Sequence, residues 1–217
     1  MPGGCCVPDL EREFSPRTAR RDLRRYRRRG PLPATRRLLD AISREGPVGG
    51  QTLLDIGGGV GAIPHELLDD GLARAKAVDA STAYLEANRE EAERSGHLAE
   101  MTFRHGDFTE IEGDLPEADI VTLDRVICCY PDMERLVTAS AGKARRLYGL
   151  VYPHERWWVR LALRGANLTF RIRRCGFRVY LHPREAVDGN VRNLGFEPRS
   201  ETTTLLWRVV LYSRTTP

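Results

Sequence analysis

The sequence predicts an α/β fold in which helices cover both faces of a doubly wound, mostly parallel sheet. Two apolar segments, residues 53–56 and 119–124, contain or end in an acidic residue, a pattern typical of strands that end at a ligand site. A glycine-rich turn follows the first of them. With 217 residues, 41% of them hydrophobic, the chain can form one such domain with short additions.

Two helices are predicted ahead of the sheet. Ser15 is suited to cap the first helix, Pro16 to occupy its first position, and Gly30 to follow its end. Prolines then interrupt the chain before a second helix, at residues 34–44, whose apolar side chains should pack on the sheet. We assign residues 1–46 to an N-terminal helical arm and residues 47–217 to the larger domain.

The turn after the first strand carries the pattern Asp-x-Gly-x-Gly-x-Gly, formed by Asp55, Gly57, Gly59 and Gly61. Glycine lets the backbone approach a ligand closely, and the helix that follows directs its free N–H groups toward the same place. Gly57-x-Gly59-x-x-Ala62 also satisfies the fingerprint of dinucleotide-binding folds. The turn alone therefore predicts a nucleotide-type cofactor, and NAD stays an alternative.

Later strand ends favour one of these interpretations. A strand at residues 73–78 ends in Asp79, followed by Ala80 and Ser81, at the distance where an acid binds ribose hydroxyls. The strand at residues 101–105 is followed by Gly106, Asp107 and Phe108. In this order the motifs resemble those of class I methyltransferases, which bind S-adenosylmethionine.

The resemblance implies roles for these residues. Asp107 would accept a hydrogen bond from the adenine amino group, and Phe108 would lie against the adenine ring. Asp124 and Arg125, at the end of the fourth strand, would lie near the methionine part of the cofactor.

The end of the chain extends this resemblance. A fifth strand is predicted at residues 146–152, and residues 198–204 and 205–212 resemble the hairpin that places an antiparallel last strand in the methyltransferase sheet. The implied fold is a Rossmann-like, doubly wound seven-stranded sheet. The implied cofactor is S-adenosylmethionine, with S-adenosylhomocysteine as product.

Charge is distributed unevenly along the chain. Residues 1–50 carry +6, residues 51–150 carry −9 and residues 151–217 carry +7. The two basic segments favour an anionic substrate. In the first of them the arginines lack interleaved aromatic residues, so a small molecule is favoured over a nucleic acid. No signal peptide or membrane span is predicted, and five cysteines without a disulfide framework favour a reducing, cytoplasmic setting.

An unusually long connection, residues 153–182, follows the fifth strand and is rich in Trp and Arg. Our first interpretation is a helical lid in which Trp157 covers an apolar substrate while Arg156 and Arg160 bind its carboxylate. An interfacial helix that touches anionic lipid and a dimer surface are the alternatives.

A closer resemblance involves Arg20 to Gly30, with Tyr26 between them, and Leu123 to Pro131. Here the chain is similar to the magnesium-protoporphyrin O-methyltransferases. That resemblance implies that Tyr26 and Cys129 lie near the substrate. Cys129 stands where that family has a histidine.

We therefore predict methyl transfer from S-adenosylmethionine to a small, apolar and anionic molecule, with O-methylation favoured. Tyr26, Asp124 and His154 are the catalytic candidates, no metal is expected, and the protein is expected to be a monomer or homodimer. The alternatives are a nucleic-acid methyltransferase, a methyltransferase for thiophilic metalloids that uses the paired cysteines Cys5-Cys6 and Cys128-Cys129, and a cofactor-binding module without catalysis.

Overall fold

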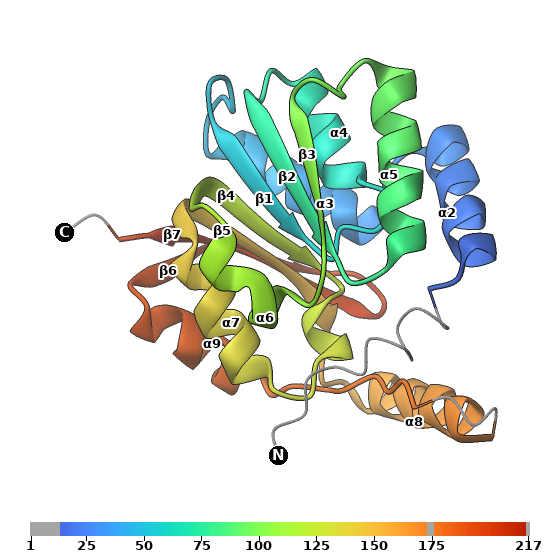
Figure 1. Ribbon diagram of the computed structural model, residues 1–217. Helices are drawn as coiled ribbons and strands as arrows, with labels where there is room; N and C mark the ends of the chain where they lie inside the picture. The colour runs from blue at the N-terminus through green and yellow to red at the C-terminus, as the bar shows by residue number, and fades with distance from the viewer. Residues whose placement is uncertain (1–13, 173–175, 216–217) are drawn as a thin grey trace.

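A computed structural model describes residues 14–172 and 176–215 and confirms the predicted α/β architecture (Figure 1). Seven strands form one sheet in the order β3-β2-β1-β4-β5-β7-β6. Strands β1 to β5 are parallel, and β7 runs antiparallel to both of its neighbours, as predicted. The strands are β1 (Thr52–Ile56), β2 (Arg74–Asp79), β3 (Met101–His105), β4 (Ala118–Asp124), β5 (Ala144–Pro153), β6 (Phe196–Thr203) and β7 (Trp207–Arg214).

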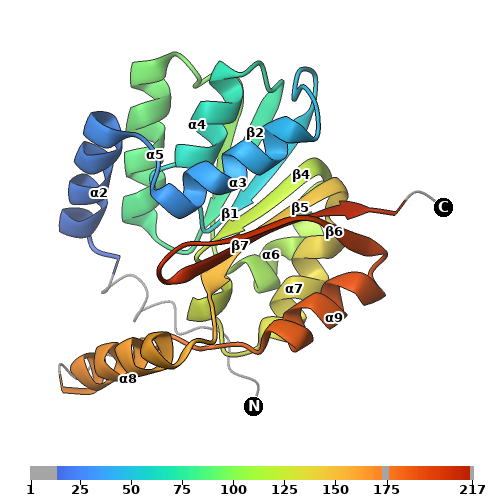
Figure 2. The same cartoon turned by 180° about the vertical axis from the view of Figure 1, so that it is seen from behind.

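Helices cover both faces of the sheet (Figures 1 and 2). The helices and short helical turns are α2 (Pro16–Arg29), α3 (Pro33–Arg44), α4 (Ala62–Asp69), α5 (Thr82–Ser95), α6 (Phe108–Ile111), η1 (Glu112–Asp114), η2 (Ile127–Cys129), α7 (Met133–Gly142), α8 (Trp157–Ile172) and α9 (Arg184–Asn193). One core lies between the sheet and α3, α4 and α5; the other lies between the sheet and α7 and α9. The strands in the middle of the sheet are buried on both faces, which explains their continuous apolar sequences.

The predicted arm consists of two helices with different environments. Helix α3 packs on the sheet beside β5 and β7, through Leu38 and Ile42 among others. Helix α2 lies outside α5, where Leu23 packs in a small cluster with Ala87, and Arg27 pairs with the buried Glu91 at 2.7 Å. Both helices end close to the sequence-predicted residues, because proline and glycine mark the boundaries. The division of the chain at residue 46 stays a prediction.

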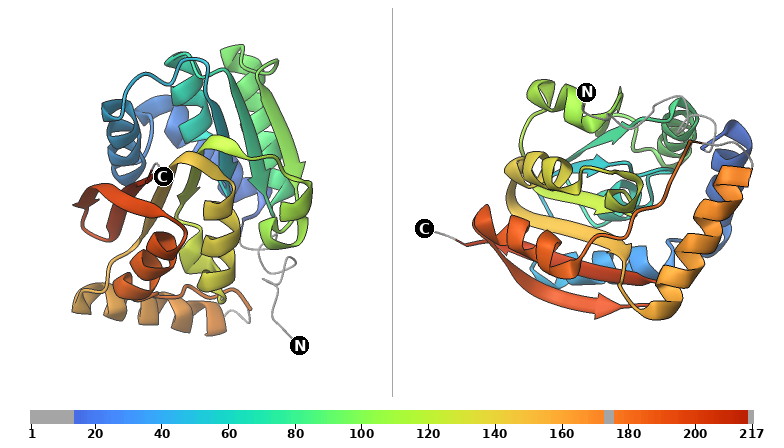
Figure 3. Two further views of the ribbon diagram at one scale, coloured as in Figure 1. Left: turned by 90° about the vertical axis from the view of Figure 1, so that its left-hand side faces the viewer. Right: turned by 90° about the horizontal axis from the view of Figure 1, so that it is seen from below.

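The connection after β5 forms helix α8, which lies along one edge of the molecule, below α2 in the view of Figure 1 (Figures 1 and 3). The chain returns along it, and the Asn167 amide exchanges two 2.8 Å hydrogen bonds with the backbone of Val179. The backbone N–H of Tyr180 then donates to the carbonyl of Cys128 at 2.6 Å. The return segment therefore runs over η2, the turn that follows β4.

One boundary prediction was wrong. Strand β7 begins at Trp207, whereas we expected Leu205 to be its first residue, because Leu205 and Leu206 form the turn of the hairpin. Among the helices within residues 14–172 and 176–215, none combines the length and apolarity that crossing a membrane requires.

Candidate active site

The glycine turn joins β1 to α4 and is shaped by backbone rather than by side chains. Gly57, Gly59 and Gly61 have φ angles of 63°, 60° and 78°, which L-residues adopt only with strain. Gly58 has an ordinary φ, but a Cβ at this position would overlap the carboxylate of Asp55. Steric constraints therefore require glycine at each of the four positions. Because these residues have no side chain, the backbone of the turn stays uncovered.

A cavity of about 510 Å³ lies over this turn, at the carboxyl ends of the parallel strands. Many of the residues predicted from sequence line it together. They are Gly57, Gly59, Asp79, Ala80, Ser81, Gly106, Asp107, Phe108, Asp124, Arg125 and Cys129. Residues from four strand ends thus meet at one place, as ligand sites do in doubly wound folds.

Asp79 is positioned by the backbone on either side of the cavity. One carboxylate oxygen accepts from the N–H of Gly59 at 3.1 Å, and the other accepts from the N–H of Ser81 at 2.8 Å. Burial raises the pKa of Asp79 to about 6, although these hydrogen bonds oppose the shift. Each oxygen keeps a second lone pair, which can accept from a ligand hydroxyl.

Asp107 is the centre of a buried hydrogen-bond network. Its Oδ1 accepts from the N–H of Thr109 at 2.9 Å, so Asp107 caps α6. The hydroxyl of Tyr130 lies 3.0 Å from each carboxylate oxygen, and it also hydrogen-bonds the hydroxyl of Thr109. The orientation of the Asp107 carboxylate is therefore set before any ligand binds.

The end of β4 holds an ion pair in a strained backbone. Arg125 has a φ of 64°, the only positive φ of a non-glycine residue within the described part of the chain. Its Nε donates to Oδ1 of Asp124 at 2.9 Å, and the hydroxyl of Thr35 donates to Oδ2 of Asp124 at 2.5 Å. Both carboxylate oxygens of Asp124 therefore accept hydrogen bonds from the protein. The neighbouring carboxylate also keeps the pKa of Arg125 raised, against the effect of burial.

Two predicted cofactor residues lie behind the turn instead of in the cavity. Asp55 is fully buried, and its Oδ1 accepts from the hydroxyl of Thr122 at 2.6 Å, while Oδ2 has no hydrogen-bond partner. Burial raises its pKa to about 7. Gly61 faces the side chain of Asn88. Both residues support the shape of the turn, but neither lines the cavity.

The predicted catalytic role of Tyr26 does not fit its position. Its ring is buried between α2 and α5, and its hydroxyl donates to Glu66 at 3.3 Å. Burial and the Glu66 carboxylate raise its pKa. It packs the arm against the body and does not line the cavity, because the apolar face of α2 turns toward α5.

The predicted lid residues and His154, a predicted catalytic residue, also lie away from the cavity. His154 is buried, and its Nε2 is 2.9 Å from the carbonyl of Leu205. Arg156 lies over the ring of Trp158, and Arg160 pairs with Glu155 at 3.5 Å. Trp157 is exposed. Helix α8 follows the carboxyl end of β5, the end of the sheet where the cavity lies, but the side chains of these residues do not point into the cavity.

The metalloid alternative has little structural support. Cys128 and Cys129 form no disulfide, their sulfur atoms lie 4.0 Å apart, and the hydrogen bond between them and burial raise the pKa of Cys129 well above its usual value. Cys5 and Cys6 lie outside the described residues. Within residues 14–172 and 176–215, no group of three or more His, Cys, Asp or Glu side chains is arranged to hold a metal ion.

The sequence placed the arm near the substrate through Tyr26, but it missed the arm residues that line the cavity. Phe14, Thr18, Arg21, Asp22, Arg25, Leu32 and Thr35 all line it. The hydroxyl of Tyr84 donates to Asp22 at 2.7 Å, which fixes α2 at the cavity entrance. Tyr130 lies within the similarity at residues 123–131, but the sequence assigns it no role of its own. No local motif marks these residues, since their partners are distant in the chain.

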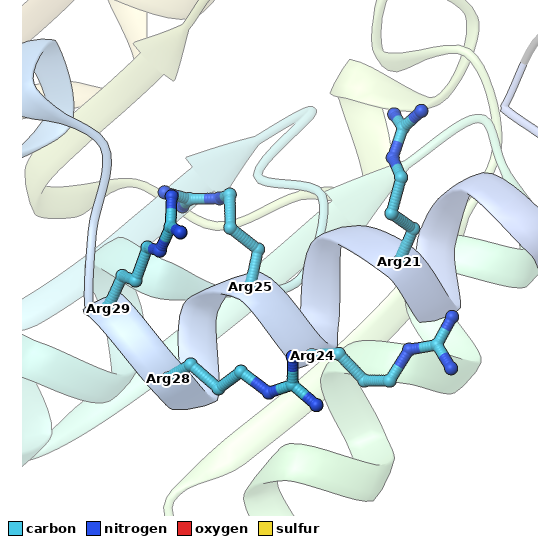
Figure 4. A pocket seen from close by; sticks show the side chains of 5 residues that line it. All are labelled: Arg21, Arg24, Arg25, Arg28 and Arg29. Atoms are coloured by element: carbon cyan, nitrogen blue, oxygen red, sulfur yellow. The ribbon is translucent and has the colours of Figure 1, made fainter.

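The outer side of α2 carries a hollow of about 360 Å³ lined by Arg21, Arg24, Arg25, Arg28 and Arg29 (Figure 4). Figure 4 shows the side chains of Arg25 and Arg29 ending side by side, whereas Arg24 and Arg28 leave the helix on the other side. Arg21 and Arg25 line both this hollow and the main cavity. The mouth of the cavity is therefore strongly basic.

Solved structures with this fold include several methyltransferases. The magnesium protoporphyrin IX methyltransferase of Synechocystis PCC 6803, with bound S-adenosylhomocysteine, has a TM-score of 0.65 and 17% identity over 99% of this chain and 90% of its own. An O-methyltransferase family protein from Burkholderia thailandensis has a TM-score of 0.69 and 15% identity, over 94% and 62%. An O-methyltransferase family 2 protein from Planctomyces limnophilus, in complex with apigenin, has a TM-score of 0.62 and 18% identity, over 84% and 61%.

These likenesses show the fold, since all three identities are low. No curated protein matches the sequence. A family model described as a methyltransferase domain matches residues 53–146, which contain the glycine turn, Asp79, Asp107 and the Asp124–Arg125 pair. Residues 53–146 are therefore a methyltransferase domain, the part of an enzyme that takes its methyl group from S-adenosylmethionine.

Proposed function

We propose that this enzyme transfers a methyl group to a carboxylate oxygen of a small, apolar molecule and forms a methyl ester. The observation that carries the proposal is the lining of the cavity. Three arginines, Arg21, Arg25 and Arg125, line it, whereas no histidine within the described residues does. Such a lining suits an acceptor that is already anionic and needs no general base.

The cofactor half of the cavity fits S-adenosylmethionine. The backbone of Gly57 and Gly59 is open to a ligand, Asp79 offers acceptors to ribose hydroxyls, and Asp107 and Phe108 suit an adenine. When bound, the cofactor supplies an activated methyl group on a sulfonium. The cavity residues then need to orient it and to exclude water.

The acceptor half lies between the arm and the turn after β4. Leu32, Val126 and Cys129 supply apolar surface, and Arg25 supplies a cation at the mouth. Burial lowers the pKa of Arg25, and so does the positive charge of Arg125. A carboxylate between these two guanidinium groups would relieve their repulsion. Residues 1–46 therefore act, in this proposal, as the arm that closes the acceptor site.

The chemistry asks little of the side chains. A carboxylate is ionised at neutral pH, and its oxygen forms a bond to the methyl carbon as the carbon–sulfur bond breaks. Holding the acceptor in line can contribute about 7–11 kcal/mol to the lowering of the barrier. Asp124 keeps its contacts with Arg125 and Thr35 during this step and takes no proton. Cys128 and Cys129 form no disulfide, which supports a reducing, cytoplasmic setting.

A direct test is transfer of a labelled methyl group from S-adenosylmethionine to a panel of small molecules. The panel contains aromatic and aliphatic carboxylic acids, each with the alcohol or phenol of the same skeleton. We expect label in the carboxylic acids only, and release of that label as methanol in base, as esters require. Transfer only to phenols, amines or RNA would overturn the proposal.

The Arg25→Gln variant tests the acceptor half separately. Loss of one charge-assisted hydrogen bond, worth about 1.5–3 kcal/mol, should raise KM for the carboxylate by about 10- to 100-fold. KM for S-adenosylmethionine should be unchanged. Arg24→Gln is the matched control, because Arg24 lies on the same helix and lines the outer hollow but not the cavity. Equal effects of the two variants would contradict the assignment of Arg25.

A further inference from the structure

Helix α8 carries an apolar stripe that is largely exposed to solvent in the described structure. Only Val159 of this helix is buried. The exposed fractions of Trp157, Leu161, Leu168 and Ile172 are 72%, 62%, 56% and 73%. At about 100° per residue, these four positions fall within about 60° of the helix circumference. Val159 lies on a different side, so the stripe is separate from the face that holds the helix to the protein.

The apolar surface continues onto the β6–β7 turn. Leu205 is 76% exposed and Leu206 is 38% exposed. This turn is tied to the start of α8, because the carbonyl of Leu205 accepts from the indole N–H of Trp158 at 3.4 Å. The same carbonyl lies 2.9 Å from Nε2 of His154. The β6–β7 turn, with its exposed Leu205, is thus held against the start of α8 in a fixed arrangement.

Positive charge borders the apolar stripe on one side. Residues 156–182 contain seven arginines and no Asp or Glu. Arg160, Arg164 and Arg171 occupy the sector of the helix next to the apolar stripe, within about 40° of one another. The nearest acidic partner is Glu155, just before the helix, which pairs with Arg160 at 3.5 Å. The surface is amphipathic and strongly basic.

The charge decides which occupant fits. A second copy docking through the same stripe would bring the two arginine flanks together, with no acidic residue on either helix to compensate them. The stripe does not line the cavity, so a substrate does not cover it either. An anionic bilayer satisfies both features, because Trp, Leu and Ile enter the headgroup boundary while arginines meet lipid phosphates.

We propose that α8, together with the β6–β7 turn, is an interfacial helix that docks this enzyme on the surface of an anionic lipid bilayer. Figure 3 shows α8 running along the side of the molecule, where a flat surface can reach its whole length. The helix would lie in the plane of the membrane without crossing it. This inference does not depend on the identity of the methyl acceptor.

Vesicle sedimentation tests the proposal. The protein should bind vesicles of phosphatidylcholine mixed with phosphatidylglycerol, bind pure phosphatidylcholine much more weakly, and lose affinity as salt increases. The triple variant Arg160→Gln, Arg164→Gln, Arg171→Gln should bind the mixed vesicles on the order of 100-fold more weakly, since each arginine near an anionic surface contributes about 1 kcal/mol. The double variant Trp157→Ser, Leu161→Ser should also lose binding.

Two matched controls distinguish docking through α8 from a general electrostatic or hydrophobic attraction of the protein to the vesicles. The triple variant Arg20→Gln, Arg24→Gln, Arg28→Gln removes the same charge from exposed positions of α2, and it should retain binding. Leu98→Ser removes an exposed apolar side chain elsewhere, and it should also retain binding. Equal losses in the α2 and α8 variants would overturn the proposal, as would the absence of binding to the mixed vesicles.

A fluorescence measurement locates the helix directly. The chain has three tryptophans, so the variant Trp158→Phe, Trp207→Phe leaves Trp157 as the only one. On mixed vesicles its emission should shift to the blue, and brominated acyl chains should quench it. A Trp157 that stays exposed to water on bound protein would overturn the proposal. So would a lipid-free dimer, seen by light scattering, that Trp157→Ser, Leu161→Ser abolishes.

Discussion

The two halves of the cavity are built in different ways. The cofactor half consists of turns that directly follow β1, β2 and β3, and much of its surface is backbone. The acceptor half consists of side chains from the arm and from the turn after β4. Its central contact, Thr35 to Asp124, joins residues 89 positions apart. A required backbone conformation restricts the residue types at and near that position, so it can be recognised in the local sequence. A contact between side chains that are distant in the chain imposes no such local pattern.

The largest expected effect comes from the backbone half. In Gly59→Val, a β-branched residue would have to adopt a φ of 60°, and its side chain would meet the ring of Tyr84 or occupy the cavity. We expect no measurable binding of S-adenosylhomocysteine by calorimetry, with circular dichroism showing a folded protein. Gly113→Val is the control, because open space surrounds that position. A folded Gly59→Val protein that binds normally would show that the turn is not the cofactor site.

Removal of Asp79 should have the next largest effect. Asp79→Ala deletes the acceptors for two ribose hydroxyls, each worth about 1.5–3 kcal/mol, and releases the N–H groups of Gly59 and Ser81. Affinity for S-adenosylhomocysteine should fall by at least about 100-fold. Asp114→Ala removes an exposed carboxylate outside the cavity and should leave affinity unchanged. Equal affinities of the Asp79 variant and the wild type would remove Asp79 from the site.

Acid pH should weaken the binding of S-adenosylhomocysteine in the same way as removal of Asp79. Burial raises the pKa of Asp79 to about 6, and ribose hydroxyls require the ionised form as acceptor. Affinity should therefore be constant above pH 6 and should fall about tenfold per unit below it, as each unit corresponds to 1.36 kcal/mol. Calorimetry across this range should show a flat profile for Asp79→Ala. A midpoint near pH 7 would indicate Asp55 instead.

The stability of the ligand-free protein should respond to pH in the opposite sense. Asp55 and Asp79 both have pKa values in the folded state that are raised above those of the unfolded chain. Their neutral forms stabilise the fold, fully below about pH 4, and this contribution is lost as pH rises through about 6 to 7. Thermal unfolding without ligand and calorimetry with ligand thus separate the two effects.

The sequence was sufficient for most of the fold and for the cofactor half. Pro16, Gly30 and the glycine turn act locally, so the elements that they limit lie close to the predicted residues. The resemblance to class I methyltransferases added the antiparallel β7. The prediction failed by two residues at Leu205, because an apolar dipeptide in a turn has the composition of a strand.

The acceptor half could not be predicted in this way. Tyr26 is an aromatic residue on a basic helix, and its sequence does not say whether the ring faces α5 or a ligand. The packing of α2 decides this, and it buries Tyr26 and places Arg25 at the cavity. Helix α8 has two apolar sides, and only the structure shows which side is free. Periodicity predicts that a helix has faces, but not what each face contacts.

The smallest effect should come from Tyr130, which belongs to the turn after β4 but acts on the cofactor half. Tyr130→Phe removes the hydroxyl that lies 3.0 Å from each oxygen of Asp107 and leaves the two hydrogen bonds from Thr109 to Asp107 in place. One hydrogen bond to a carboxylate that is still partly satisfied is worth about 1 kcal/mol, so affinity for S-adenosylhomocysteine should fall about fivefold. The control is Tyr148→Phe, because the hydroxyl of Tyr148 bonds Ser140 at 2.7 Å in the core and does not line the cavity. That variant should lose stability without losing affinity. If Tyr130→Phe also lost stability without losing affinity, Tyr130 would be a packing residue. The turn after β4 would then not influence cofactor binding through Tyr130.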